Sequence, residues 1–147
     1  MVKLRVGIAG FGRVGKIRKA CISEHGGFEV VAVCDGLFRE VDFEDGIKYF
    51  KTYKELFSVD FDVLFVCLSN DMASEVTIAG LKKGLHVFCE KPPGRTLQEI
   101  KDVIIIEKSQ PSRKLMYGFN HRYHDSVIDT LKILNSKRLG KVINMRG

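Results

Sequence analysis

The sequence lacks several features that would assign it to a specialised class of protein. No apolar run reaches the roughly 18 residues needed for a membrane-spanning helix, and no repeat or low-complexity segment occurs. The apolar start, residues 1–10, has no small-residue cleavage site behind a longer apolar core, so it predicts a buried strand rather than a signal peptide. With 45% hydrophobic and 29% charged residues over 147 positions, the composition fits one ordinary globular domain with a substantial core.

Cysteines are few and widely spaced. None of the four belongs to a C-x-x-C pair, so neither a zinc site nor a redox motif is predicted, and no metal is expected. Cys34, Cys67 and Cys89 each lie in an apolar run typical of a core strand, where a thiol packs as a small hydrophobic side chain. Because unpaired thiols suit a reducing compartment, we expect a cytoplasmic location.

The net charge of +6 is not gathered into the basic stripe typical of nucleic-acid binders. The basic residues are dispersed, and most of them, such as Lys16, Arg18 and Lys19, fall where a helix is expected to face solvent. Neither a nucleic-acid nor a membrane partner is expected. A mild positive field would instead attract an anionic dinucleotide or an acidic substrate.

Short apolar runs alternate with amphipathic stretches along the whole chain. The apolar runs are continuous rather than alternating, which indicates strands buried on both faces and hence a parallel sheet covered by helices. The order predicts an α/β fold, a Rossmann-type doubly wound parallel sheet with right-handed crossovers. The expected strands are residues 6–9, 28–34, 47–50, 61–68, 85–89, 115–119 and 141–145.

Apolar residues recur at helical spacing between these strands. The first expected helix carries the stripe Val14, Ile17 and Cys21. Thr52 is expected to cap a short helix, and Thr96, with Glu99 three residues later, has the pattern of a capping box. The last expected helix spans residues 125–137.

The loop after the first strand fits the pattern G-x-G-x-x-G. It consists of Gly10, Phe11, Gly12, Arg13, Val14 and Gly15, and it follows a strand and opens a helix. In this context the first glycine allows a tight turn, the second lets a pyrophosphate approach the backbone, and the third lets the helix pack close to the strand. The helix N-terminus would supply N–H groups and positive dipole to the phosphates. The alternative interpretation is a glycine-rich structural turn.

Asp35 lies twenty residues after Gly15, at the end of the second strand. A carboxylate there accepts hydrogen bonds from the adenosine ribose and repels a 2′-phosphate, which favours NAD as the cofactor. Arg39, four residues further on, could pair with such a phosphate, so NADP stays open. Asp35 could also be an ordinary turn residue at a strand end.

Two further segments, read with the glycine loop, resemble a known family. "GLHVFCEKP" spans residues 84–92, and "GFNHRY" spans residues 118–123. Together they resemble the glucose–fructose oxidoreductase and inositol dehydrogenase family (Gfo/Idh/MocA), essentially over the whole chain. The tripeptide Glu90-Lys91-Pro92 is the most specific part of this resemblance.

The resemblance implies roles for individual residues. It gives Lys91 a catalytic role, in which the ammonium group reaches both the nicotinamide ribose and a substrate hydroxyl. A cation there would stabilise a developing alkoxide, although Lys91 could also be a solvated loop lysine. Pro92 would hold the turn, and it allows a cis Lys91–Pro92 bond. The cofactor-binding set implied beyond the glycine loop and Asp35 is Leu68, Ser69, Asn70, Glu90, Lys91, Pro92, Asn120 and Arg122.

The chain also departs from the family pattern. Family members often have Thr-Pro-Asn-x-x-His after the fourth strand, whereas residues 68–73 read Leu-Ser-Asn-Asp-Met-Ala. The family's Asp-x-x-x-His acid/base pair does not occur in this sequence. His121 and His124 are weaker alternatives as bases, because packed or surface histidines are commoner than catalytic ones.

These observations lead to two hypotheses about the chain. In the first, residues 1–119 are a dinucleotide-binding domain, and residues 120–147 are a junction helix and the first strand of a second, substrate-binding domain. The chain would then belong to an NAD(P)-dependent oxidoreductase acting on a sugar, cyclitol or nucleotide sugar, would form a homo-oligomer, and would be inactive as the fragment given. In the second, it is a complete small NAD(H)-binding sensor or regulatory module.

Overall fold

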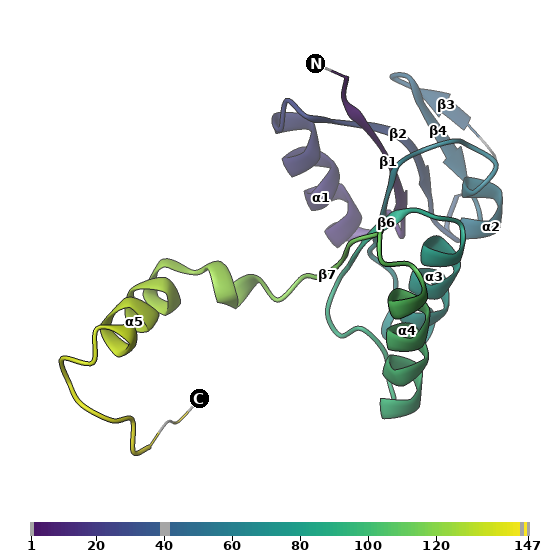
Figure 1. Ribbon diagram of the computed structural model, residues 1–147. Coiled ribbons are helices and arrows are strands. Elements are labelled where there is room, and N and C mark those ends of the chain that lie inside the picture. Colours follow the sequence, from purple (N-terminus) through teal and green to yellow (C-terminus); the bar gives the residue numbers. More distant parts are fainter. Residues whose placement is uncertain (1, 39–41, 145, 147) are drawn as a thin grey trace.

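A computed structural model describes residues 2–38, 42–144 and 146. Its centre is a seven-stranded sheet with the order β3-β4-β2-β1-β5-β6-β7, parallel except for β3, which pairs antiparallel with β4 (Figure 1). The order runs outward from β1 in both directions, so the predicted doubly wound sheet is confirmed. The strands are β1 Leu4–Ala9, β2 Phe28–Cys34, β3 Asp42–Glu44, β4 Ile47–Phe50, β5 Val63–Val66, β6 His86–Cys89 and β7 Leu115–Tyr117.

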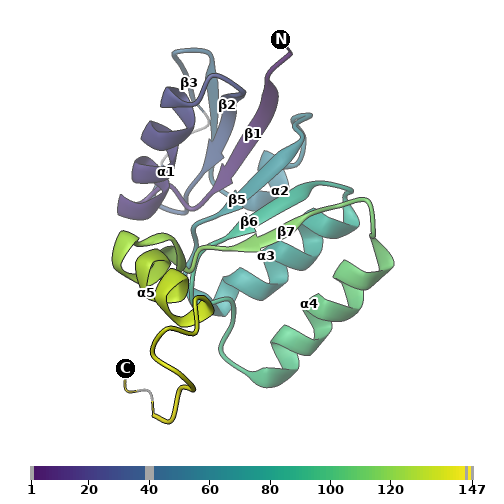
Figure 2. The ribbon, with the colours of Figure 1, turned by 60° about the vertical axis from the view of Figure 1, so that its left-hand side comes forward.

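Helices cover both faces of the sheet. They are α1 Arg13–Glu24, α2 Tyr53–Leu56, α3 Asn70–Lys82, α4 Leu97–Ser109, the 3-10 helix η1 Asn120–Tyr123, and α5 Asp125–Asn135. α1 lies on one face, and α2, α3 and α4 lie on the other (Figures 1 and 2). Among the described residues, no helix is both long and apolar enough to cross a membrane.

The core has two parts, one on each face of the sheet. On the α1 face, Ile8 is fully buried and packs in one cluster with Ile22 of α1. On the opposite face, Leu64 of β5 and Val76 of α3 are fully buried in the larger cluster. β1 and β5 supply residues to both clusters, which explains why these strands read as continuous apolar runs.

The apolar stripe of α1 does not face the sheet, although an apolar helix face usually packs against the core. Val14 is 41% and Ile17 is 50% exposed, and Cys21 is exposed as well, whereas Gly15 and Ile22 face the sheet. The reason is steric, because a Cβ on Gly15 would lie 2.1 Å from the carbonyl oxygen of Gly10. α1 therefore packs closely against the end of β1 through Gly15, and the side of the helix that carries Val14 and Ile17 faces solvent.

Both predicted N-caps form, but the complete capping box occurs at Thr52 rather than at Thr96. The expected capping box at Thr96 forms only in part: Thr96 accepts from the backbone N–H of Glu99, but the Glu99 carboxylate binds the backbone N–H of Arg95. A complete capping box instead joins Thr52 and Glu55 at the start of α2. Both threonines still supply the N-cap hydrogen bond that a helix start requires.

The end of the described chain differs most from expectation. The expected last helix forms as α5, but it buries no residue, and it projects away from the sheet (Figure 1). The predicted strand over residues 141–145 does not appear in residues 141–144, and Met145 lies outside the described residues. A strand needs a neighbouring strand for its hydrogen bonds, and residues 141–144 pair with none in the described part of the chain.

We expect the amides of α5 and of residues 141–144 to exchange with solvent far faster than those of β5. An 11-residue helix without tertiary packing is marginal in water, whereas β5 lies inside the sheet and should open only on global unfolding. Hydrogen exchange measures this at a concentration where the chain is shown to be monomeric, with α3, which has a buried face, as the helical control. Equal protection of α5 and α3 would contradict the expectation.

Candidate functional site

Most of the sequence-predicted site residues meet at one edge of the sheet. Four segments follow the carboxyl ends of parallel strands: residues 10–15 after β1, which include the start of α1, Asp35 after β2, residues 67–70 after β5, which end at the start of α3, and residues 90–92 after β6. In an open parallel sheet this edge, where the strand order reverses, is the usual place for a ligand. Here the reversal lies beside β1, directly under the glycine loop.

The three glycines of the loop have different surroundings. A Cβ on Gly10, whose φ is +90°, would lie 2.5 Å from the carbonyl oxygen of Cys67, and one on Gly15 would overlap Gly10. A Cβ on Gly12 would meet nothing within 4 Å. The protein's own packing therefore requires glycine at positions 10 and 15, whereas at position 12 the missing side chain leaves open space beside the backbone.

The open space at Gly12 adjoins the N-terminus of α1. Gly12 is the N-cap residue, no side chain caps this end, and the first turn carries no acidic residue. The N–H of Lys16 makes the first hydrogen bond along the helix, to Gly12. The N–H groups before it have no partner within the helix and point out of its end with the positive end of the dipole, which suits an anion.

Asp35 holds the glycine loop in place. One carboxylate oxygen accepts from the backbone N–H of Phe11 at 2.8 Å, and the other accepts from Leu37 at 2.9 Å. The ring of Phe11 is buried beside Phe38 and Tyr49, so this side chain anchors the loop in the core and does not face a ligand. A carboxylate has about four acceptor positions, so Asp35 can still accept hydrogen bonds from hydroxyl groups.

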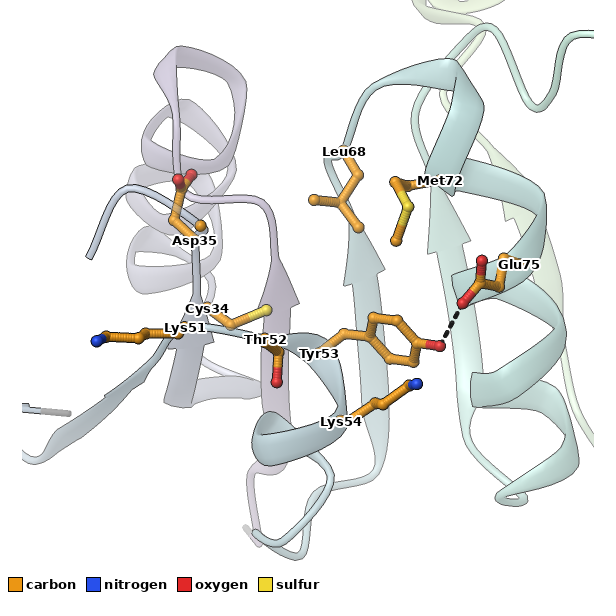
Figure 3. Close-up of a pocket in the computed structure, with 10 residues that line it drawn as sticks. Cys34, Asp35, Lys51, Thr52, Tyr53, Lys54, Leu68, Met72 and Glu75 are labelled. Carbon is orange, nitrogen blue, oxygen red and sulfur yellow. Dashed lines mark hydrogen bonds between the residues drawn. The ribbon is translucent and has the colours of Figure 1, made fainter. Parts of the chain in front are cut away.

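A cavity of about 380 Å³ extends from Asp35 between β2, α2 and α3 (Figure 3). Burial raises the pKa of Cys34 to about 12, so the thiol on the cavity wall stays protonated and unreactive. The lining residues are Cys34, Asp35, Gly36, Lys51, Thr52, Tyr53, Lys54, Leu68, Met72 and Glu75. Cavities of this size accommodate small organic ligands.

Sequence reasoning missed the far wall of this cavity. Tyr53 of α2 donates its hydroxyl to the Glu75 carboxylate of α3 at 2.5 Å, which joins the two helices across the cavity (Figure 3). This hydrogen bond raises the pKa of Tyr53 to about 12, so the phenol remains a donor. The sequence did contain a signal for the residues after β4, which include Tyr53. β4 was expected as a strand, and because it is parallel to β2, the residues after it lie at the same edge of the sheet as Asp35.

The turn after β6 presents Lys91 to solvent. Lys91 is exposed and makes no side-chain hydrogen bond or ion pair within the described chain, and the Lys91–Pro92 peptide bond is cis. Glu90 points the other way, because its carboxylate accepts from Arg18 of α1 at 2.6 Å. Of this tripeptide, Lys91 is therefore the side chain available to a ligand.

The remaining predicted residues fall into two groups. Ser69 and Asn70 lie at the start of α3 on the edge described above, with Ser69 as its N-cap residue. Asn120, in η1, is joined to α1 by a 3.1 Å hydrogen bond from Arg18. Arg122 is exposed, and no contact brings its side chain to the edge in the part of the chain that the structure describes.

The histidines and cysteines weighed from sequence as alternative functional groups do not gather at this edge of the sheet as a group. His121 and His124 are both exposed, and His124 hydrogen-bonds with Ser126 at 2.9 Å. All four cysteines are free. Within residues 2–38, 42–144 and 146, no cluster of three or more His, Cys, Asp or Glu side chains is arranged to hold a metal ion.

Comparison with known proteins gives a family match. Residues 4–119 match the model of the oxidoreductase family with an NAD-binding Rossmann fold, Gfo/Idh/MocA. The chain is 28% identical to inositol 2-dehydrogenase of Salmonella typhimurium over 151 residues, which cover 98% of the chain and 45% of the relative. It is 30% identical to D-glucoside 3-dehydrogenase of Escherichia coli, covering 82% of the chain and 36% of the relative. The chain thus spans less than half the length of these relatives.

Solved structures agree with this match. The crystal structure of myo-inositol 2-dehydrogenase from Lactobacillus plantarum superposes with a TM-score of 0.84 at 27% identity, covering 96% of this chain and 43% of that one. Scyllo-inositol dehydrogenase from Lactobacillus casei, solved with NAD(H) and scyllo-inositol, has a TM-score of 0.87 at 24% identity, with coverages of 95% and 43%. The second likeness concerns the fold alone.

Proposed function

This chain belongs to the Gfo/Idh/MocA oxidoreductase family, whose NAD-binding Rossmann fold it shares, and we propose that it is the nucleotide-binding part of an NAD(P)-dependent oxidoreductase. The whole enzyme would move a hydride between nicotinamide and a secondary alcohol or ketone of a sugar, cyclitol or nucleotide sugar. The relatives named for inositol and glucoside dehydrogenation support this substrate class. The observation that carries the proposal is the open space at Gly12, beside an uncapped helix N-terminus and next to Phe11, whose backbone N–H binds Asp35.

Three parts of this edge are assigned here to three parts of the dinucleotide. The space at Gly12 admits a pyrophosphate against the N–H groups of α1. The cavity beside Asp35 takes the adenosine, with the carboxylate accepting from the ribose hydroxyl groups. The turn after β6, with Lys91, lies two strands from β1 on the side away from β2, and it would face the nicotinamide half.

The bound dinucleotide supplies a hydride acceptor or donor, and Lys91 would supply charge. Its ammonium group is exposed and has no protein partner in the described chain, so it can donate a hydrogen bond to a substrate oxygen. A cation there stabilises the alkoxide character that develops as hydride leaves the carbinol carbon. This role favours an enzyme over a sensor module, because a sensor needs no cation at that position.

Proton transfer requires a further group. The sequence contains no Asp-x-x-x-His pair, and the exposed His121 and His124 lie beyond β7. We propose that the chain binds cofactor but turns over little by itself, with residues 1–119 as the dinucleotide-binding unit and residues 120–147 as the junction to a substrate-binding part.

We also propose that the protein self-associates and is cytoplasmic. The exposed Ile128 and Leu131 of α5 support self-association. The four free cysteines support a reducing, cytoplasmic location.

Titration of the chain with NADH, followed by nucleotide fluorescence or calorimetry, tests the proposed function directly. We expect saturable binding with one site per chain. Absence of NADH binding to a folded chain would reject the proposal.

We expect the chain to bind NADH at least about tenfold more tightly than NADPH, because Asp35 repels a 2′-phosphate at close range. Asp35→Ala should narrow this ratio, and it should also weaken NADH binding, since Phe11 loses its hydrogen-bond acceptor. Asp35→Asn, which keeps the shape and one acceptor oxygen, isolates the charge and should narrow the ratio with a smaller loss for NADH. Tighter NADPH binding by the unmutated chain would contradict the expectation and would point to Arg39, which lies outside the described residues.

A further inference from the structure

We propose that Arg18 is a positioning residue, which fixes the turn carrying Lys91 and joins it to the glycine-loop helix and to η1. This inference rests on the proposed function, because it concerns the nicotinamide half of the same site. Arg18 lies on α1 three residues after Gly15, and from sequence it was expected at a solvent-facing position. Its side chain is in fact only 20% exposed.

The guanidinium group of Arg18 connects three segments that are far apart in sequence. Its Nε donates to Glu90 Oε1 at 2.6 Å, and one of its terminal nitrogens forms an ion pair with the same oxygen. That terminal nitrogen, Nη2, also donates to the side-chain oxygen of Asn120 at 3.1 Å. The guanidinium carbon lies 5.1 Å from the centre of the Phe88 ring, within cation–π distance. The group thus links α1, the end of β6 and η1.

The surroundings of Glu90 are shaped to hold its carboxylate. Glu90 is only 11% exposed, so its ion pair with Arg18 is shielded from water far better than a surface pair. Gly118, directly after β7, leaves the room that this carboxylate needs, since a Cβ there would lie 2.8 Å from Glu90 Oε2. The backbone of Gly118 is itself fixed by a hydrogen bond from its N–H to Cys89.

The ion pair between Arg18 and Glu90 affects the position of Lys91. Lys91 follows Glu90 directly and has no side-chain partner of its own in the described chain, so its direction is set by the backbone that precedes it. A shielded ion pair at Glu90 therefore determines where the Lys91 ammonium group can reach. The adenosine cavity uses residues of β2, α2 and α3 and includes neither Arg18 nor Glu90. Loss of Arg18 should affect the nicotinamide end and spare the adenosine end.

The test compares NADH with ADP-ribose, which lacks the nicotinamide, in titrations of the chain. Arg18→Met should weaken NADH binding about tenfold, as expected for a modest displacement of a binding group, and should change ADP-ribose binding less than twofold. Glu90→Gln should give the same pattern, and the double variant should lose no more than either single one. Arg18→Lys, which keeps the charge but not the fork of donors, should recover only part of the loss.

Lys16→Met is the matched control, because it removes one positive charge from an exposed position of the same helix. It should leave the ratio of the two affinities unchanged. Equal weakening of NADH and ADP-ribose in Arg18→Met would show that Arg18 only stabilises the helix, and an unchanged NADH affinity would show that it positions nothing. A wild-type chain that binds NADH no better than ADP-ribose would overturn the inference as well. Binding of neither nucleotide by the wild-type chain would instead reject the proposed function.

Discussion

Gly12→Val is expected to abolish measurable NADH binding while the chain remains folded. A Cβ at position 12 meets no atom beyond its chain neighbours within 4 Å, and the backbone there is extended, a conformation that valine adopts readily, so we expect the free protein to fold. The valine side chain would, however, occupy the space that the pyrophosphate needs and would hold the phosphates away from the N–H groups at the start of α1. We expect the affinity to fall at least about a hundredfold, which corresponds to roughly 2.7 kcal/mol.

The measurement is an NADH titration of both proteins, together with their thermal unfolding. Gly26→Val is the matched control, because Gly26 also has open space around it and lies in the turn after α1, away from the carboxyl edge. It should match the wild-type chain in both measurements. Unchanged NADH affinity in Gly12→Val would show that the phosphates lie elsewhere, and the assignment of the glycine loop would then be wrong.

The fold could be predicted largely because its strands are buried on both faces. Such strands read as unbroken apolar runs, and the bounds expected for β2 and β4 match the structure. β3 was missed because it has three residues and little apolar character. A signal was available, since Asp45 and Gly46 both adopt positive φ in the turn to β4, and Asp-Gly is typical of a tight hairpin.

The direction that a helix faces was harder to predict. Periodicity showed that Val14, Ile17 and Cys21 share a side of α1, and an apolar side usually faces the core. Here the contact of Gly15 with the strand decides the rotation, and glycine contributes nothing to an apolar pattern. The same rotation carries Arg18, another residue of this helix, inward to Glu90.

Residues of the candidate site could be predicted where each lies in a single segment directly after a strand. The glycine loop, Asp35 and Lys91 each follow a parallel strand, and the topology alone brings them to one edge. Contacts between distant segments have no such local signature. The Tyr53–Glu75 and Arg18–Glu90 pairs join residues 22 and 72 positions apart, and their geometry depends on how helices pack on the finished sheet.

Gly15→Ala should have the opposite effect to Gly12→Val and destabilise the fold itself. The added Cβ would lie 2.1 Å from the carbonyl oxygen of Gly10, which is backbone and cannot rotate away as a side chain could. α1 would have to move off β1, and its buried contact through Ile22 would open as well. Overpacking of this kind costs about 3 kcal/mol, a large share of the 5–15 kcal/mol that stabilises a typical domain.

Thermal and urea unfolding of the chain measure this loss, with Gly26→Ala as the control, since its methyl group meets no atom within 4 Å. We expect the midpoint of Gly15→Ala to fall by about 10 °C and that of the control to stay within about 2 °C of the wild-type value. NADH should then partly restore the midpoint of Gly15→Ala, because a ligand that binds the folded state stabilises it. A Gly15→Ala protein as stable as the wild-type chain would mean that α1 can pack further from β1, and the close approach assigned to Gly15 would not be required by the fold.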